Sequence, residues 1–196
     1  LYLRHASRTV LMHIINAIKT GDVSEAPRLE AMLSHTIQSN KEREMAYVRQ
    51  ATHDALTGCK NRRAFDSDVA ELLNAQQPFA MALVDIDNFK SINDTLGHLT
   101  GDIVLRNVAR EGIQIMQPHH VSLYRYGGEE FAVIFQAEQM TSALSLLEAW
   151  RTAVEKRVWR EENLRVTFSG GLGEWHFEPL EQFVGSVDNA LYSAKQ

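Results

Sequence analysis

A pair of glycines between two short apolar segments constrains the fold of this chain more than any other feature. Gly127 and Gly128 separate the runs Val121–Tyr126 and Phe131–Phe135, both rich in residues that favour strands. Because glycine adopts positive φ without penalty, paired glycines between two such runs predict a tight β-hairpin. Two glutamates follow the glycines. In isolation they would be ordinary solvated charges at a turn, but a hairpin would hold them on a rigid element.

A second acidic motif lies at the end of a predicted buried strand. The run Phe79–Ile86 is apolar until it reaches Asp85, and Asp87 follows it. Since side chains alternate between the faces of a strand, the two aspartates share one face at its C-terminal end. A carboxylate there is costly unless it is paired or bound to metal. Asp85, the Ile86 carbonyl and one hairpin glutamate would form an all-oxygen site, which suits Mg²⁺ or Mn²⁺. For Asp87 we favour a role as the N-cap of the next helix.

Length and charge restrict the class of protein. A chain of 196 residues accommodates one domain with an appendage, or two small domains. The net charge of −5 argues against a nucleic-acid binder, which would show a basic face. A nucleotide remains a possible ligand, because a few lysines and a divalent metal offset its phosphates.

Cysteine content and hydropathy indicate the cellular context. The one cysteine, Cys59, excludes an internal disulfide and fits a reducing compartment. The longest apolar run, Val10–Ile18, is too short to cross a bilayer. The chain begins at Leu1 rather than methionine, so we expect it to be a piece of a longer protein. We therefore expect a cytoplasmic chain, either free or as the cytosolic part of a membrane-anchored protein.

The hydrophobic pattern divides the chain into a helical part, residues 1–52, and a mixed part, residues 53–196. In the helical part, Thr9–Ile18 has the apolar spacing of an amphipathic helix. Pro27 stands early in a second helix that extends to Thr52. A helical hairpin of this size buries little apolar surface alone, so we expect a stalk that self-associates. The alternative is a hairpin folded back on its own domain.

The mixed part begins with a helix and continues in the order β-α-α-β-β-α-β-α. This order predicts an α/β (α+β) sandwich, in which helices cover a central sheet that contains antiparallel strands. Outside the hairpin, the predicted helices and strands are Asn61–Gln76, Phe79–Ile86 (strand), Asn88–Leu96, Gly101–Met116, Met140–Trp159, Leu164–Gly171 (strand) and Pro179–Ala194.

Polar residues that follow the acidic strand indicate a nucleotide site. Lys90 lies near a helix N-terminus, and both are suited to hold phosphate. Asn93, His98 and Asp102 lie on either side of a glycine-broken turn between two helices. Asn93 and Asp102 together match a guanine edge, because the carboxylate accepts from the ring N–H and the exocyclic amine while the amide accepts or donates. Singly, Asp102 is more often an N-cap and Asn93 a helix-end residue, so the prediction depends on their combination.

These motifs together resemble the GGDEF family of diguanylate cyclases. Arg125-Tyr126-Gly127-Gly128-Glu129-Glu130-Phe131 is an accepted GGEEF variant of the family signature. The pattern also includes Asp85-Ile86-Asp87-x-Phe89-Lys90-x-x-Asn93-Asp94, Gly97-His98-x-x-Gly101-Asp102, Asp54-x-Leu56-Thr57-Gly58 and Asp188-x-Ala190-Leu191-Tyr192-x-Ala194-Lys195. The resemblance covers residues 54–196 and leaves the helical part outside it.

The resemblance implies a palm-like nucleotide-cyclase sheet and an enzyme that condenses two GTP molecules into cyclic di-GMP, with release of two pyrophosphates. It implies a homodimer of facing catalytic domains, aligned by the helical part and controlled by an upstream sensory domain. Each active site would use two Mg²⁺ or Mn²⁺ ions.

The resemblance also assigns roles to individual residues. Asp85, the Ile86 carbonyl and Glu129 would bind the metals. Glu129 would accept the 3′-hydroxyl proton, with Glu130 beside it as the second catalytic residue. The substrate-binding residues would be Asn93, His98, Asp102, Lys90, Phe89, Gly127, Gly128 and Lys195.

The chain departs from the family pattern at two places. Pro118 and Val121 stand where many members have the Arg-x-x-Asp of a product-inhibition site, so we expect that feedback site to be absent. The family continues past Lys195 with Gly-Arg-Asn, whereas this chain stops at Gln196. We therefore expect a C-terminally truncated domain that lacks a phosphate-binding arginine.

The alternative function is a catalytically weak or inactive GTP-binding regulatory module. Degenerate members of the family usually lose the hairpin glycines, a glutamate or the strand aspartate. This chain keeps all of them, so we favour an active enzyme.

Overall fold

The structure, a computed structural model, describes residues 11–13, 15, 19–20 and 26–196. The chain divides into two compact units, Leu1–Ala51 and Thr52–Gln196. The helix α2 (Ala26–Thr52) accounts for most of what is described of the first unit, which confirms the predicted second helix. Of the predicted helix Thr9–Ile18, residues 11–13 and 15 are described and are helical. The rest of that helix and the hairpin turn lie outside the described residues.

None of the helices in the described ranges is long and apolar enough to span a membrane.

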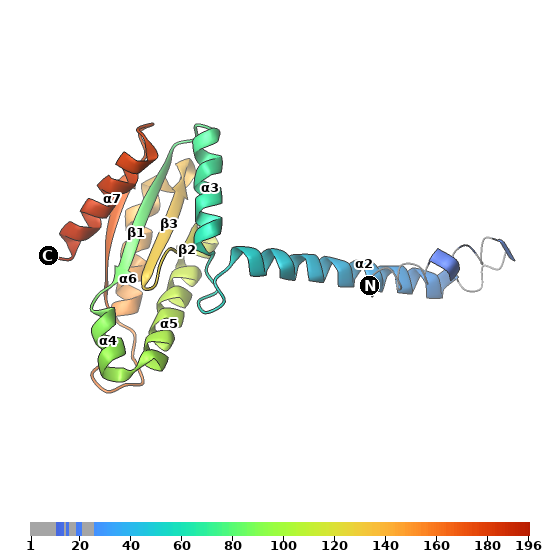
Figure 1. Cartoon of the computed structure of the whole chain (residues 1–196), viewed down its shortest axis with the longest axis horizontal. Coiled ribbons are helices and arrows are strands. Elements are labelled where there is room, and N and C mark those ends of the chain that lie inside the picture. The colour runs from blue at the N-terminus through green and yellow to red at the C-terminus, as the bar shows by residue number, and fades with distance from the viewer. Residues whose placement is uncertain (1–10, 14, 16–18, 21–25) are drawn as a thin grey trace. The chain divides into compact units, whose positions relative to one another are not determined.

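A four-stranded antiparallel sheet forms the centre of the second unit (Figure 1). Its strands are β1 (Phe79–Ile86), β2 (Ser122–Arg125), β3 (Glu130–Gln136) and β4 (Phe168–Glu174). The strand order is β2-β3-β1-β4, so β1 pairs on both sides. Its residue Ala82 lies opposite Val133 of β3 and Leu172 of β4.

Helices cover both faces of this sheet, which confirms the predicted sandwich. One face packs against α3 (Arg62–Asn74) and α7 (Leu180–Ala194), and the other against α5 (His98–Met116) and α6 (Ala143–Glu155). The short helix α4 (Phe89–Leu96) connects β1 to α5. Two 3₁₀ helices, η1 (Gln117–His119) and η2 (Ala137–Ser142), precede β2 and α6. From β1 onward the order of elements is the predicted one.

Side-chain alternation along β1 builds the core on both sides of the sheet. The even-numbered residues from Ala80 to Ile86 pack with α5 and α6, and the odd-numbered residues from Phe79 to Leu83 pack with α3 and α7. Both faces are therefore apolar until Asp85, whose side chain is 17% exposed. The strand is buried along its length and ends at a carboxylate, as the sequence predicts.

The predicted hairpin is confirmed, but its turn differs from the predicted one. β2 and β3 pair from Ser122 opposite Ile134 to Arg125 opposite Phe131. Neither glycine of the turn has a positive φ, since the positive-φ glycines in the described part of the chain are Gly58 and Gly97. The turn is instead closed by two backbone N–H groups, those of residues 126 and 127, which both donate to the carbonyl of residue 130.

The packing of α7 on β4 gives a test of this layered arrangement. A β-carbon at Gly171 would clash with the Val187 carbonyl oxygen and the Leu191 nitrogen of α7. We expect Gly171→Ala to destabilise the protein by about 1–3 kcal/mol, because the helix must move away from the sheet. Thermal unfolding would report this as a decrease of about 2–4 °C in Tm per kcal/mol.

Gly185→Ala is the matched control within α7, since a β-carbon there has no neighbour within 4 Å. Loss of a glycine from the helix interior should stabilise the protein by about 0.5–1 kcal/mol. A Gly171→Ala protein as stable as the wild type would contradict the packing of α7 on the sheet.

Candidate active site

Two paired strands bring carboxylates together at one end of the sheet. The register places Asp85 of β1 directly opposite Glu130, the first residue of β3. Residues opposite each other share a face of the sheet, so both side chains lie on the face covered by α3 and α7. Lys195, just after α7, reaches the same point: its Nζ lies 2.7 Å from Asp85 Oδ1. Asp85, a predicted metal ligand, therefore forms an ion pair with the Lys195 ammonium group in this structure.

The other two predicted metal-binding residues adjoin this pair. The Ile86 nitrogen donates to the carbonyl oxygen of Glu129 at 3.4 Å, which joins the end of β1 to the residue before β3. The Glu129 side chain is half-buried. The structure thus brings Asp85, Ile86, Glu129 and Glu130 together, as the sequence predicts, although the roles of these residues stay predictions.

The electrostatics of this cluster raise the pKa of Glu130 above its ordinary value of 4.5. The first cause is partial burial, and the negative charges of Asp85, Glu129 and Asp188 act in the same direction. Lys195 acts in the opposite direction, but it carries one charge against several. The cluster therefore has an excess of negative charge.

These residues fit a divalent cation without forming a complete site for it. The donors are carboxylate oxygens and a backbone carbonyl, which Mg²⁺ and Mn²⁺ prefer, and the excess negative charge favours a cation. Over the residues that the structure describes, no group of three His, Cys, Asp or Glu side chains is placed to enclose an ion. A bound cation would therefore take its remaining ligands from phosphate and water, as Mg²⁺ commonly does.

Asp87 does not cap the next helix, so that prediction is wrong. Asn88 occupies the N-cap position of α4 with a positive φ, and no side chain caps this helix. The Asp87 carboxylate instead accepts hydrogen bonds from Thr167 Oγ1 at 2.6 Å and from Ser169 Oγ at 2.8 Å. Two hydroxyls from a distant segment override the local capping preference, and a sequence pattern does not reveal such partners.

The predicted guanine-binding residues lie where α4 meets α5. The side-chain oxygen of Asn93 lies so close to Gly101 that a β-carbon there would clash with it. The ring of Phe89 would lie 3.2 Å from the same β-carbon, and Phe89 is buried. Asp102 follows Gly101 and is half-buried; it is not an N-cap, because Gly97 has that position in α5. Glycine at position 101 therefore makes room for the side chain of Asn93.

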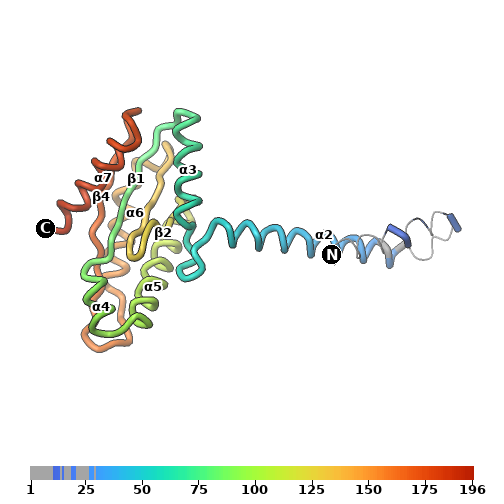
Figure 2. Tube along the Cα trace, in the orientation of Figure 1, coloured from blue at the N-terminus to red at the C-terminus, as the bar shows by residue number. Residues whose placement is uncertain are grey.

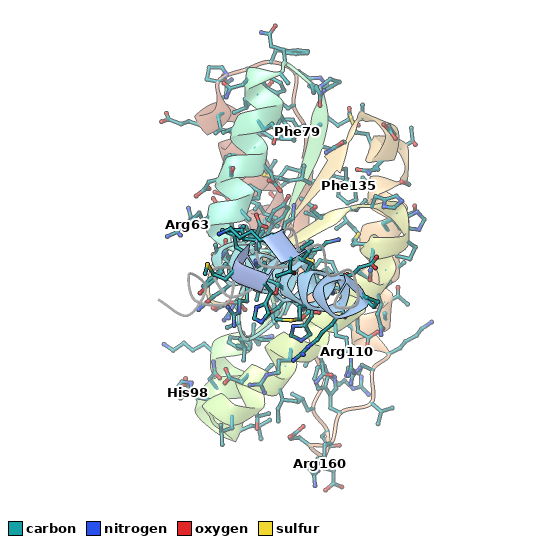
Figure 3. All side chains as sticks on the ribbon, turned by 90° about the vertical axis from the view of Figure 1, so that its right-hand side faces the viewer. Arg63, Phe79, His98, Arg110, Phe135 and Arg160 are labelled. Carbon is teal, nitrogen blue, oxygen red and sulfur yellow. The ribbon has the colours of Figure 1, made fainter. Side chains whose placement is uncertain are left out.

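The remaining predicted residues of this region have exposed side chains. Lys90 lies on α4 and His98 begins α5, and the chain passes directly from β1 through these two helices (Figure 2). Figure 3 shows His98 far from Phe79 and Phe135, which mark the other end of the sheet. Among the described residues, neither Lys90 nor His98 forms an ion pair or hydrogen bond with the carboxylate cluster.

Arg125 holds the hairpin and was not among the predicted site residues. Its Nε and Nη2 donate to the Gly128 carbonyl oxygen at 3.2 and 2.9 Å, and its Nη1 donates to Asp54 Oδ1 at 3.1 Å. Burial alone would raise the pKa of Asp54, but hydrogen bonds from Thr57 and Arg125 lower it below its ordinary value of 3.8. The sequence contained a signal for this contact, since Asp54 begins the motif Asp54-x-Leu56-Thr57-Gly58 and Arg125 begins the hairpin motif.

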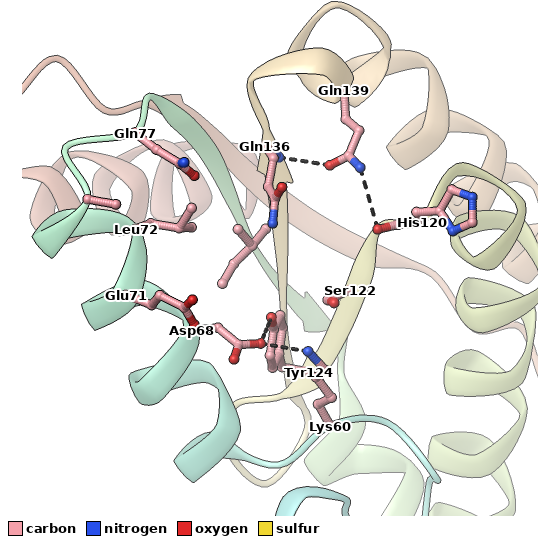
Figure 4. A pocket seen from close by; sticks show the side chains of 12 residues that line it. Lys60, Asp68, Glu71, Leu72, Gln77, His120, Ser122, Tyr124, Gln136 and Gln139 are labelled. Carbon is pink, nitrogen blue, oxygen red and sulfur yellow. Dashed lines mark hydrogen bonds and ion pairs between the residues drawn. The ribbon is translucent and has the colours of Figure 1, made fainter.

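A polar cleft of about 280 Å³ lies along β2, away from the carboxylate cluster (Figure 4). In it, Asp68 Oδ2 accepts from Tyr124 Oη and pairs with Lys60 Nζ, each at 2.6 Å. Burial and the neighbouring Asp68 raise the pKa of Tyr124 above its ordinary value of 10. Neither this cleft nor a second hollow of about 330 Å³, beside Cys59, contains a predicted site residue. The candidate site is therefore defined by its charged side chains and oxygen ligands, and not by either hollow.

Removing the charge of Glu130 tests the electrostatics of the cluster. The pKa of Glu130 is higher in the folded chain than in the unfolded one. Below pH 4.5 the carboxyl is protonated in both states, so it does not lower the stability of the fold. As the pH rises through the folded-state pKa, the carboxyl ionises and destabilises the fold. We expect Glu130→Gln to raise Tm at neutral pH by no more than about 2 °C, since water screens an exposed group.

The difference from wild type should vanish when Tm is measured below pH 4.5. Glu174→Gln is the control, because Glu174 is an exposed glutamate on β4 that lies opposite Ala80, at the other end of the sheet from Asp85. A gain in Tm at acidic pH as large as the gain at neutral pH would show that the effect is not electrostatic.

Comparison with known proteins places this geometry in a family. Residues 51–196 match the family described as "Diguanylate cyclase, GGDEF domain". The diguanylate cyclase VdcA of Vibrio cholerae serotype O1 is 37% identical over 161 residues, which are 79% of this chain and 47% of that protein. The chain spans about half the length of the curated relatives it matches.

Solved structures agree in fold and sequence. The coiled coil and GGDEF domain of DgcB from Caulobacter crescentus, in complex with c-di-GMP, matches with a TM-score of 0.71 at 32% identity, over 89% of this chain and 95% of that one. The active GGEEF domain of a diguanylate cyclase from Vibrio cholerae matches with a TM-score of 0.62 at 31% identity, over 70% and 90% of the two chains. The chain therefore belongs to the GGDEF family of diguanylate cyclases.

Proposed function

We propose that this chain condenses two molecules of GTP into cyclic di-GMP and releases two pyrophosphates. One observation carries the proposal: Asp85 and Glu130 face each other from paired strands at the end of the sheet where Lys195 joins them and α4 begins. This arrangement combines an all-oxygen cation site with an ammonium group for phosphate. The reaction consumes GTP, so we assign the catalytic unit to the cytoplasm.

The guanine binds at the junction of α4 and α5 in this proposal. The Asp102 carboxylate accepts from the ring N–H and the exocyclic amine, and Asn93 completes the recognition with its amide. His98 lines the same site from the start of α5. The close contact between Asn93 and Gly101 supports this assignment, because it holds the amide next to the residue that precedes Asp102.

The triphosphate extends from the guanine site towards the hairpin. Lys90, the backbone at Phe89 and the backbone of Gly127 and Gly128 hold it along the way. Lys195 reaches its far end. The ion pair of Lys195 with Asp85 neutralises part of the carboxylate cluster until a cation arrives, and the ammonium group is then available to the phosphates.

The chemical step is the attack of a 3′-hydroxyl on an α-phosphate. Two Mg²⁺ or Mn²⁺ ions would lower the pKa of that hydroxyl and neutralise charge on the phosphates. Asp85, the Ile86 carbonyl and Glu129 would hold the ions, and Glu129 would accept the hydroxyl proton. Glu130 lies beside Asp85, where its charge adds to the field that attracts the cations.

Each domain holds one GTP, so two domains must face each other for the reaction. We propose that α2 aligns them as a two-stranded coiled coil. Its apolar residues Leu33, Ile37 and Tyr47 are 38%, 65% and 72% exposed. They lie on a seam in which residues are spaced alternately by four and three, and Asn40 and Glu44 occupy the two intervening positions. A seam asparagine favours a single register.

Incubation with GTP and Mg²⁺, followed by chromatography, tests the proposed reaction. We expect the wild type to form cyclic di-GMP with two pyrophosphates for each product molecule. Glu129→Gln should lower the rate by about 10²–10⁴-fold while GTP still binds, because a general base and cation ligand is lost. Glu174→Gln should keep the wild-type rate. A wild-type chain that binds GTP at high protein concentration and forms no product would instead support a GTP-binding regulatory module.

Charge on the α2 seam tests the proposed dimer. Ile37→Glu should raise the dissociation constant of the dimer by about a hundredfold, since two buried isoleucines are each worth at least about 1.5 kcal/mol. The rate of product formation should fall with it and recover at higher protein concentration. His35→Glu is the control, because residue 35 lies on the opposite side of α2 and is also exposed. Equal oligomeric state and activity in both variants, measured by sedimentation and product assay, would exclude the seam.

A further inference from the structure

Arg62 is held against the hairpin by an aromatic ring. Its guanidinium carbon lies 4.3 Å from the centre of the Tyr126 ring, and its Nη2 donates to Tyr126 Oη at 3.4 Å. The Tyr126 ring in turn meets the Phe65 ring edge to face, with the ring centres 5.1 Å apart. A guanidinium group that stacks on a ring keeps most of its N–H donors available for other partners. The stack therefore fixes the position of this cation and leaves it able to bind an anion.

The place of Arg62 in α3 is unfavourable for a cation. It is the first residue of the helix, after the N-cap Asn61, and the positive end of the helix dipole lies there. It also begins the stripe of α3 whose other members, Phe65, Val69 and Leu72, are buried against the sheet. Among the described residues, no carboxylate forms an ion pair with it. Neither the helix nor an ion pair therefore accounts for an arginine at this position.

The ring that holds Arg62 lies beside the carboxylate cluster. Tyr126 N donates to the Glu130 carbonyl oxygen at 2.9 Å, and the Tyr126 side chain packs on the same face of the sheet as Glu130 and Asp85. Since neighbouring strands lie about 4.8 Å apart, two strand spacings, or about 10 Å, separate Tyr126 from Asp85. Arg62 and Lys195 thus come from the two helices that cover this face, and they lie on opposite sides of Glu130.

We propose that Arg62 is a phosphate-binding residue of the catalytic site, and that it binds a different phosphate from the one at Lys195. The inference rests on the proposed function, which places the triphosphate of GTP along the hairpin. A distance of about 10 Å is too long for one phosphate group to contact both cations. The phosphate at Arg62 belongs either to the GTP of the same domain or to the GTP that the facing domain holds. Both sources offer the oxygens that a planar guanidinium binds through paired N–H groups.

Two substitutions separate charge from shape at this position. Arg62→Met keeps a long side chain over the Tyr126 ring and removes the charge, whereas Arg62→Lys keeps the charge and loses the planar group. We expect Arg62→Met to lower GTP affinity, or the rate at saturating GTP, by about tenfold or more, the effect of losing a hydrogen bond to a charged group. Arg62→Lys should lose less. Guanosine affinity should stay unchanged in both variants, because guanosine has no phosphate.

The quantity that changes identifies the source of the phosphate. A loss of GTP affinity in Arg62→Met indicates the GTP of the same domain. An unchanged affinity with a lower rate at saturating GTP indicates the GTP of the facing domain. Arg63→Met is the matched control, because Arg63 is the next residue, is exposed, and has no aromatic contact or ion pair among the described residues. This control should keep the wild-type affinity and rate.

Chemical protection gives a measurement that needs no turnover. A dicarbonyl reagent modifies exposed arginines, and mass spectrometry identifies the modified sites. In the wild-type protein, we expect GTP and inorganic pyrophosphate each to slow the modification of Arg62 severalfold, because a bound phosphate covers its N–H groups. The modification of Arg63 should stay at its original rate.

The outcomes separate the inference from the proposed function. Equal losses in Arg62→Met and Arg62→Lys, or no loss in either, would overturn the inference and show that Arg62 only stabilises the hairpin. Modification of Arg62 at the same rate with and without pyrophosphate would overturn it as well. A wild-type protein that forms no cyclic di-GMP would overturn the proposed function, while protection by pyrophosphate would still decide whether Arg62 binds a phosphate.

Discussion

The antiparallel pairing of β1 with β3 and β4 is the constraint on which the rest of the structure depends. β1 is apolar on both faces, so it must lie between two strands and between two layers of helices. A slip of one residue would turn its carboxylate towards the core on the α5 side, and the cost of burying that charge excludes such a slip. The same register sets Asp85 opposite Glu130 on one side and opposite Ser169 on the other. Burial of the strand therefore specifies the fold and the site together.

The site gains its chemistry from an arrangement that works against stability. Partial burial and the carboxylates of Asp85, Glu129 and Asp188 raise the pKa of Glu130, and Lys195 offsets part of the repulsion. A domain without a function here would have little reason to gather these charges at the end of its most buried strand. The packed core on both faces of the sheet holds the acidic groups close enough to attract cations and phosphate.

Much of the fold was predictable from the sequence, because the strongest signals are local. The strand Phe79–Ile86 has the predicted bounds, and the hairpin and the order of elements are confirmed, since apolar periodicity reports burial directly. The prediction for Asp87 failed because its partners are distant in the sequence. Asp87 binds hydroxyls some 80 residues away instead of capping α4, and the pattern gave no sign of them. The turn differs for a local reason: its glycines have no positive φ, and the carbonyl of residue 130 closes it by accepting from residues 126 and 127. Asp85, Ile86, Glu129, Glu130 and Lys195 lie together at the end of β1, whereas the roles of all the predicted site residues stay predictions.

The contact between Arg125 and Asp54 joins the beginning of the second unit to the hairpin. The helix α2 ends at Thr52, two residues before Asp54. From there one guanidinium extends to the carbonyl of Gly128, the residue that precedes Glu129. This connection consists of the Arg125 side chain alone and does not involve the close-packed core, which would resist deformation. Such hydrogen bonds depend on distance and direction, so the position of the acidic turn depends on that of the segment at Asp54.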